Sequence, residues 1–226
     1  MSLLVLGGAG YIGSHMVKRL LDEKENVIVI DNLSKGHLKA VDLRAAFIEG
    51  DIRDKDLLRD VFEKYEIEAV FHFCAYMQIP ESIVKPNDYF DNNVYGLIAL
   101  IDVMKDFKIN KLIFSSSAAV YGIPENSPIS EDTSKNPINP YGLTKLMMEQ
   151  IMKWDGEAYG IKWLAFRYFN VAGAQIDCSI GEDHRPESHL IPIVLEAAAG
   201  KRECVEMCGN DYATRDGYNI RDYVHV

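Results

Sequence analysis

Residues 3–13 read Leu3-Leu4-Val5-Leu6-Gly7-Gly8-Ala9-Gly10-Tyr11-Ile12-Gly13, an apolar run that leads directly into glycines. The run predicts a buried strand, and the glycines at 7, 10 and 13 stand where a tight turn would open a helix. Glycine lets the backbone approach a pyrophosphate closely, and the helix N-terminus offers N–H groups and partial positive charge. Asp31 ends the next apolar run, where a carboxylate can accept from both ribose hydroxyls and would repel a 2′-phosphate. The stretch predicts a dinucleotide site that prefers NAD to NADP, with a purely structural glycine turn as the alternative.

The same alternation of short apolar runs and longer helical runs continues along the chain. The apolar runs are rich in Val, Ile, Leu and Phe and nearly continuous, as in strands buried on both faces. This pattern predicts an α/β fold, a Rossmann-type doubly wound parallel sheet. The predicted strands are 3–6, 27–30, 46–48, 69–73, 111–115 and 163–168, and the predicted helices are 11–23, 54–65, 91–106 and 141–159.

The pattern changes at about residue 173. A polar, loop-like stretch over 175–188 precedes a predicted helix at 190–199, a short apolar run at 205–207 and a final apolar alternation at 223–226. We therefore expect an NAD-binding domain over residues 1–172 and a smaller, incomplete substrate domain over 173–226.

Composition excludes several classes of protein. The chain has 226 residues, 48% hydrophobic, and a formal net charge of −10, so nucleic acid and anionic membranes are not expected partners. Neither a secretory leader nor an apolar stretch of membrane-spanning length occurs in the sequence, and the four cysteines form no CxxC pair. These features predict a cytoplasmic protein with reduced thiols and no metal site.

A second set of residues carries candidate catalytic chemistry. Tyr141 and Lys145 are four residues apart and would share one face of a helix, where the ammonium would lower the pKa of the phenol and make it a usable base. Ser117 belongs to the run Ser115-Ser116-Ser117 at the end of the predicted fifth strand, at the edge of the sheet where this fold binds ligands. Asp51 follows the third strand, and its sequence alone fits either a helix N-cap or, with a dinucleotide bound, a contact to adenine.

Several longer stretches resemble a known family. The glycine pattern, Asp31-Asn32-Leu33, Asp51-Ile52, Asn92-Asn93-Val94, Ser117 and Tyr141…Lys145 are similar to the extended short-chain dehydrogenase/reductases. More narrowly, the chain resembles the UDP-glucose 4-epimerase family in residues 114–122, 167–170, 189–192, 209–212 and 221–225.

The resemblance implies a reaction and a set of roles. Oxidation and re-reduction at sugar C4 through a 4-keto intermediate would interconvert UDP-glucose and UDP-galactose, with Ser117, Tyr141 and Lys145 as catalytic residues and NAD as cofactor. Subunits would pair as a homodimer through the runs near 91–106 and 141–159. The implied NAD contacts are Gly7, Gly10, Tyr11, Ile12, Gly13, Asp31, Asn32, Asp51, Ile52, Phe73, Ala75, Asn92, Ser117, Tyr141, Lys145 and Phe169. The implied UDP-sugar contacts are Ser117, Tyr141, Asn170, His189, Leu190, Glu206, Met207, Cys208 and Arg221, the last with a surface ion pair to Asp222 as its alternative.

Other activities fit parts of the sequence. Ala118 and Ala119 stand where related dehydratases carry an acid, so elimination chemistry is not expected. A UDP-N-acetylglucosamine 4-epimerase remains an alternative, as does a catalytically inactive NAD- or nucleotide-sugar-binding fragment, because the resemblance suggests a chain truncated at its C-terminus. Met77 replaces a lysine that some family members carry, Cys74 replaces alanine and Cys208 replaces an aromatic residue, which weakens the expectation of tight NAD retention.

Overall fold

The computed structural model describes residues 1–226, which form two compact units, Met1–Tyr168 and Phe169–Val226. The sequence pattern placed the corresponding change after residue 172. None of the helices combines the length and the apolar character that a membrane crossing requires.

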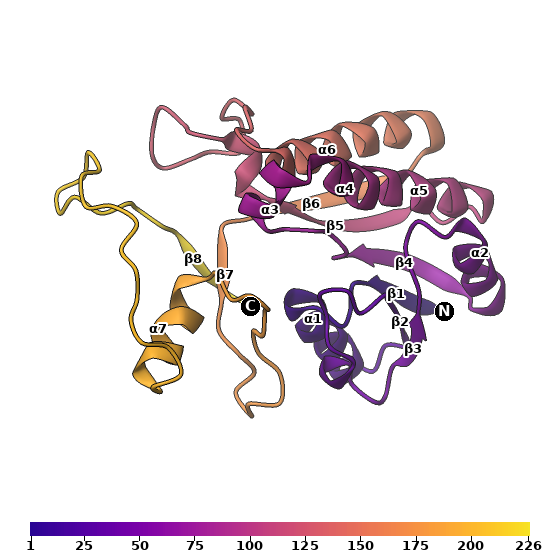
Figure 1. The fold of residues 1–226 in the computed structure, drawn as a ribbon. Coiled ribbons are helices and arrows are strands. Elements are labelled where there is room, and N and C mark those ends of the chain that lie inside the picture. The colour runs from indigo at the N-terminus through magenta and orange to yellow at the C-terminus, as the bar shows by residue number, and fades with distance from the viewer. The chain divides into compact units, whose positions relative to one another are not determined.

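The first unit contains a six-stranded parallel sheet (Figure 1). Its strand order is β3-β2-β1-β4-β5-β6, the order of a doubly wound dinucleotide-binding fold, so the predicted fold class is confirmed. The strands are β1 (Ser2–Leu6), β2 (Val27–Asp31), β3 (Ala46–Glu49), β4 (Ile67–His72), β5 (Lys111–Ser117) and β6 (Lys162–Tyr168).

Alternate residues of β1 to β5 belong to or pack against two separate cores, whereas β6 packs one face on the larger core and leaves Leu164 and Phe166 of its other face exposed. On β1, Leu4 and Leu6 belong to one core and Val5 to the other, and all three are fully buried. The larger core packs the sheet against α2 (Lys55–Lys64), α5 (Gly96–Asp106) and α6 (Pro140–Tyr159), and the smaller one packs it against α1 (Tyr11–Asp22). Figure 1 shows α5 and α6 on the face of the sheet opposite α1. Burial of both faces explains why β1, β2, β4 and β5 read as nearly continuous apolar runs.

The segment before α5 differs from the predicted helix at 91–106. Two short helices, α3 (Ile79–Val84) and α4 (Pro86–Tyr89), were not predicted, and they lead into a π-helical segment, η2 (Phe90–Tyr95). Pro80 and Pro86 each begin a short helix near its first turn, which the apolar pattern does not reveal. A π-helical segment often occurs at a functional site, and this one carries Asn92 and Asn93.

The second unit has a small two-stranded sheet and one helix. Strand β7 (Asn170–Ala172) pairs in parallel with β8 (Tyr223–His225), and α7 (Leu190–Ala198) lies between them in sequence. The side chain and the backbone amide of Asn170 both donate to the Asp222 carbonyl, at 2.8 and 3.1 Å. The apolar run at 205–207 forms neither a strand nor a helix.

Candidate functional site

The turn between β1 and α1 requires glycine at two positions. Gly7 has a φ of +79°, and a Cβ on Gly13 would lie 2.1 Å from the Gly7 carbonyl oxygen. No side chain caps the N-terminus of α1 and no acidic residue lies in its first turn. The turn thus leaves the close backbone approach and positive helix end that a pyrophosphate needs, so the residues present fit NAD.

Asp31 lies against this turn at the end of β2. Its side chain accepts hydrogen bonds from the backbone amides of Ala9, at 3.0 Å, and Leu33, at 2.8 Å. The residue is only 7% exposed, and burial raises the pKa of its carboxyl although the two N–H groups oppose that shift. A carboxylate fixed beside the glycine turn is in the place expected for recognition of the adenosine ribose.

Asp51 lies next to Asn32 and does not cap a helix. The N-cap of α2 is Asp54, whose side chain accepts from the amides of residues 56 and 57, so the interpretation of Asp51 as a cap is wrong. Asp51 instead forms a two-point ion pair with Arg53, at 2.7 and 2.8 Å, and accepts from Asn32 Nδ2 at 3.0 Å. The guanidinium holds the pKa of Asp51 well below its usual range. The buried Ile52 follows it.

Two neighbouring asparagines connect the π-helical segment to the segment after β4. Asn93, which is fully buried, accepts from the Tyr76 amide at 2.8 Å and donates to Thr144 Oγ1 at 3.1 Å. Thr144 in turn donates to the Tyr141 carbonyl at 2.7 Å. Asn92 donates to Asn93 Oδ1. These hydrogen bonds hold the loop that contains Phe73 and Ala75 against the start of α6. Of the two asparagines, only Asn92 had been assigned a role from the sequence.

The three candidate catalytic residues are carried by β5 and α6. Ser117 is the last residue of β5, and Tyr141 and Lys145 lie in the first turns of α6, whose N-cap is Asn139. The Lys145 ammonium donates to the Ser115 carbonyl at 2.7 Å and lies 5.9 Å from the centroid of the Tyr141 ring. The predicted sharing of one helix face by Tyr141 and Lys145 therefore agrees with the geometry.

The expected effect of Lys145 on the phenol is not seen in this structure. Burial raises the pKa of Tyr141, and a hydrogen bond with Ser117 opposes that shift only in part. Burial also lowers the pKa of Lys145 to about 7, with the charges of Cys74 and Glu149 opposing it. The sequence-based expectation considered only the neighbouring charge, whereas burial is the largest cause of the pKa shifts of both Tyr141 and Lys145.

A largely buried ion pair, Glu149 with Arg167, links the elements that carry the three candidate catalytic residues. The sequence pattern did not predict it. Glu149, one turn after Lys145, accepts from Arg167 Nε at 2.9 Å, from an Arg167 terminal nitrogen at 2.7 Å and from Ser116 Oγ at 2.5 Å. Arg167 also donates to the Tyr121 hydroxyl at 2.7 Å. The pair joins α6 to the ends of β5 and β6. Its only signal in the sequence is a charged residue at a core-facing position of a helix.

The remaining predicted residues lie in the second unit. His189 is the N-cap residue of α7 and Leu190 begins that helix. Arg221 donates to the Ile220 carbonyl and forms no ion pair with Asp222, so that alternative is wrong. The other residues of the set are Phe169 and Asn170, which adjoin or begin β7, and Glu206, Met207 and Cys208, which follow α7 outside any helix or strand.

Comparisons with known proteins agree with this geometry. The model of the NAD dependent epimerase/dehydratase family matches residues 3–226. A UDP-glucose 4-epimerase of Lacticaseibacillus casei is 55% identical over 226 residues, which cover 100% of this chain and 68% of that protein. A crystal structure of UDP-glucose 4-epimerase has a TM-score of 0.97 at 53% identity, with 100% of this chain and 68% of that chain covered. The Brucella ovis UDP-glucose 4-epimerase in complex with NAD has a TM-score of 0.96 at 47% identity, with 99% and 69% covered. The chain belongs to the NAD-dependent epimerase/dehydratase family.

Proposed function

We propose that the chain interconverts UDP-glucose and UDP-galactose through a 4-keto sugar. The observation that carries the proposal is that Ser117 ends β5 while Tyr141 and Lys145 lie in the first turns of α6, which packs on a sheet whose first turn fits NAD. Identity of 55% to a UDP-glucose 4-epimerase over the whole chain supports the choice of this sugar pair. Bound NAD would supply the oxidation and the re-reduction at carbon 4.

The chain's own residues would handle the proton. The Tyr141 phenolate oxygen would take the proton of the sugar 4-hydroxyl and later return it, so the chain would end each turnover unchanged. Lys145 would stabilise the phenolate by its charge, and Ser117 would orient the reacting hydroxyl. Ala118 and Ala119 follow Ser117 in a short 3-10 helix, η3 (Ala118–Tyr121), and carry no acid that could protonate a leaving hydroxyl. This supports epimerisation over elimination.

The NAD contacts in the proposal come from the first unit, except Phe169, which is the first residue of the second unit. They are the glycine turn, with Gly7, Gly10, Tyr11, Ile12 and Gly13, and the strand-end residues described above. Ser117, Tyr141 and Asn170, together with residues 173–226, would supply the UDP-sugar contacts, including His189 and Arg221. A guanidinium such as that of Arg221 binds a diphosphate well, which supports its place in this set.

Oligomeric state and location are further parts of the proposal. A homodimer through η2–α5 and α6 is supported by their exposed apolar side chains, Tyr95, Ile98, Leu143 and Trp154. Sedimentation velocity would show a species of twice the chain mass. The four cysteines are free, which fits a reducing cytoplasm.

The test is conversion of UDP-galactose to UDP-glucose by the purified chain with added NAD. Tyr141→Phe should lower turnover by about 100-fold or more, because it removes the acid–base group. Tyr159→Phe is the matched control, since Tyr159 lies at the exposed end of the same helix, and it should leave turnover unchanged. A chain that binds NAD but does not convert the sugar, or a Tyr141→Phe variant with normal turnover, would contradict the proposal.

A further inference from the structure

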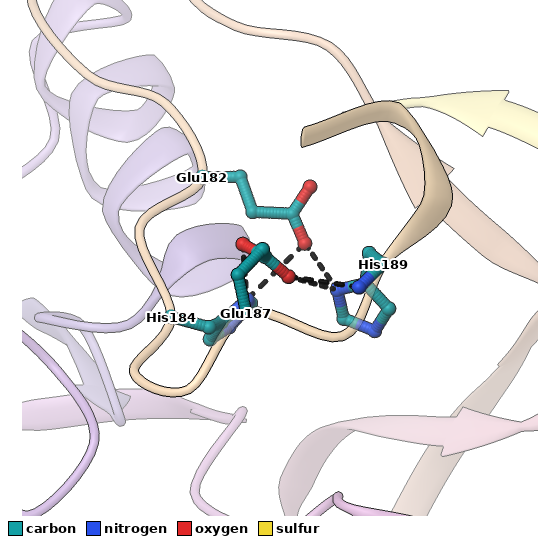
Figure 2. Close-up of side chains that lie close together, drawn as sticks. All are labelled: Glu182, His184, Glu187 and His189. Carbon is teal, nitrogen blue, oxygen red and sulfur yellow. Dashed lines mark hydrogen bonds and ion pairs between the residues drawn. The ribbon is translucent and has the colours of Figure 1, made fainter. Parts of the chain in front are cut away.

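Four side chains of the second unit converge in the loop that precedes α7. Glu182, His184, Glu187 and His189 each offer one ligand atom, and these atoms all lie within 4.8 Å of one another. Figure 2 shows both imidazoles and both carboxylates turned toward a common centre. The sequence predicted no metal site, and of these four residues only His189 had been assigned a role, as a UDP-sugar contact. The spacing of the four, at positions 1, 3, 6 and 8 of an irregular loop, matches neither helix nor strand periodicity.

The distances within the set suit a small cation. Glu182 Oε1 lies 3.2 Å from His184 Nδ1 and is paired with His189 Nδ1. Glu187 Oε1 lies 3.6 Å from His189 Nδ1, and Glu187 Oε2 lies 3.9 Å from His184 Nδ1. The centroids of the two imidazole rings are 5.2 Å apart, with an interplanar angle of 76°. Ligand atoms placed tetrahedrally at about 2.1 Å from Zn²⁺ are separated by roughly 3.4 Å. The nitrogen and oxygen atoms are thus already close to the spacing of a tetrahedral site.

Charge and burial point in the same direction. The side chains of Glu182 and Glu187 are only 7% and 6% exposed, and the imidazole side chain of His184 is 13% exposed. Neither glutamate has a lysine or arginine partner, and the one arginine within the loop, Arg185, pairs with Asp183 instead. The two carboxylates bring negative charge into a largely buried cluster, which is costly without a counter-charge. One divalent cation bound by all four side chains would neutralise it.

One glutamate is also fixed by the backbone. Glu187 Oε1 accepts from the amides of Ser188, at 2.7 Å, and His189, at 2.8 Å, at the start of α7. These bonds hold the carboxylate in place and leave its second oxygen available. A donor set of two imidazoles and two carboxylates is compatible with Zn²⁺, and four protein ligands are typical of a closed, structural site.

We propose that Glu182, His184, Glu187 and His189 bind one Zn²⁺ ion that fixes the loop between β7 and α7. The site would not take part in the proton chemistry of Tyr141. His189 faces the cluster through Nδ1, which leaves its Nε2 for the UDP-sugar contact proposed for this residue. Its role would be to hold the first turn of α7 in the conformation seen here.

The experiment uses the untagged chain, saturated with zinc and then gel-filtered, with the metal measured by mass spectrometry. About one zinc per chain is expected, and cobalt in its place should give the visible absorption of a tetrahedral site. The double variant Glu182→Gln/His184→Asn should lose the metal while circular dichroism shows a folded chain. Should that variant not fold, Glu187→Gln alone is expected to weaken zinc binding by at least tenfold.

The exposed cysteines provide the matched control, because thiolates could also bind zinc. The triple variant Cys178→Ser, Cys204→Ser and Cys208→Ser should keep one zinc with unchanged affinity. A wild-type chain that remains metal-free in excess zinc, or zinc that is lost only with the cysteines, would overturn the proposal. Because the readout is metal content, its outcome does not depend on whether the chain epimerises a sugar.

Discussion

Replacing Glu149 by alanine should test how much the ion pair with Arg167 contributes to holding α6 against the ends of β5 and β6. The Glu149 side chain is 7% exposed, and its loss removes the carboxylate partner of Arg167 and the acceptor of the Ser116 hydroxyl. Removing one partner of a buried pair costs about 3–5 kcal/mol. Arg167 is 21% exposed and keeps its bond to Tyr121, so we expect the lower end, about 3 kcal/mol. For a chain of this size that corresponds to a fall in Tm of roughly 6–12 °C.

Urea and thermal unfolding of the purified chain measure this effect. The control is Glu157→Ala, because Glu157 lies on the same helix, is exposed and forms no ion pair, and its loss should cost less than about 0.5 kcal/mol. The double variant Glu149→Met/Arg167→Met should be more stable than Glu149→Ala, since it leaves no buried charge unpaired. Equal unfolding free energies for Glu149→Ala and Glu157→Ala would refute the reasoning.

Three further perturbations follow from the site. Gly13→Ala should weaken NAD binding by about tenfold or more by calorimetry, because its Cβ would meet the Gly7 carbonyl oxygen at 2.1 Å, and unchanged affinity would contradict the fit. Asn93→Ala should destabilise the chain by roughly 1–3 kcal/mol in urea, because buried partners lose their hydrogen bonds, and a neutral result would remove its positioning role. The Lys145 pKa is lowered to about 7, so the folded chain releases this proton before the unfolded chain does. Between about pH 7 and 10 the stability of the wild type relative to Lys145→Met should therefore rise with pH, and a constant difference would contradict the shift.

The sequence predicted the structure best where a short pattern of residues is compatible with only one local conformation. The glycine spacing and Asp31 are such a case, since a Cβ at position 13 collides with backbone and the acid ends the neighbouring strand. The strands were found because burial on both faces leaves continuous apolar runs, and their ends differ from the prediction by one or two residues. The short proline-initiated helices before α5 have no apolar periodicity and were missed.

Pairings between distant segments could not be predicted in the same way. Glu149 and Arg167 meet because β6 lies beside β5 and α6 packs on both, a fact of topology rather than of spacing. The four ligand atoms around Glu182 converge through the path of an irregular loop, for which no period exists. In both cases the residue types were visible in the sequence but their partners were not.

The pKa values of Tyr141 and Lys145 show how much free energy is needed to form the Tyr141 phenolate in the protein alone. Moving a proton from the phenol to the amine leaves the net charge unchanged, so the cost depends on the gap between their pKa values. Lys145 is near 7 and Tyr141 lies above its ordinary value of 10, which makes the gap at least about 4 kcal/mol. The Lys145 ammonium lies 5.9 Å from the centroid of the Tyr141 ring. Two opposite charges about 6 Å apart attract by about 3 kcal/mol at an effective dielectric constant of 20. The chain alone therefore keeps Tyr141 mostly protonated, and positive charge brought close to the phenol by a bound ligand, such as the nicotinamide of NAD, would tip the balance toward the phenolate.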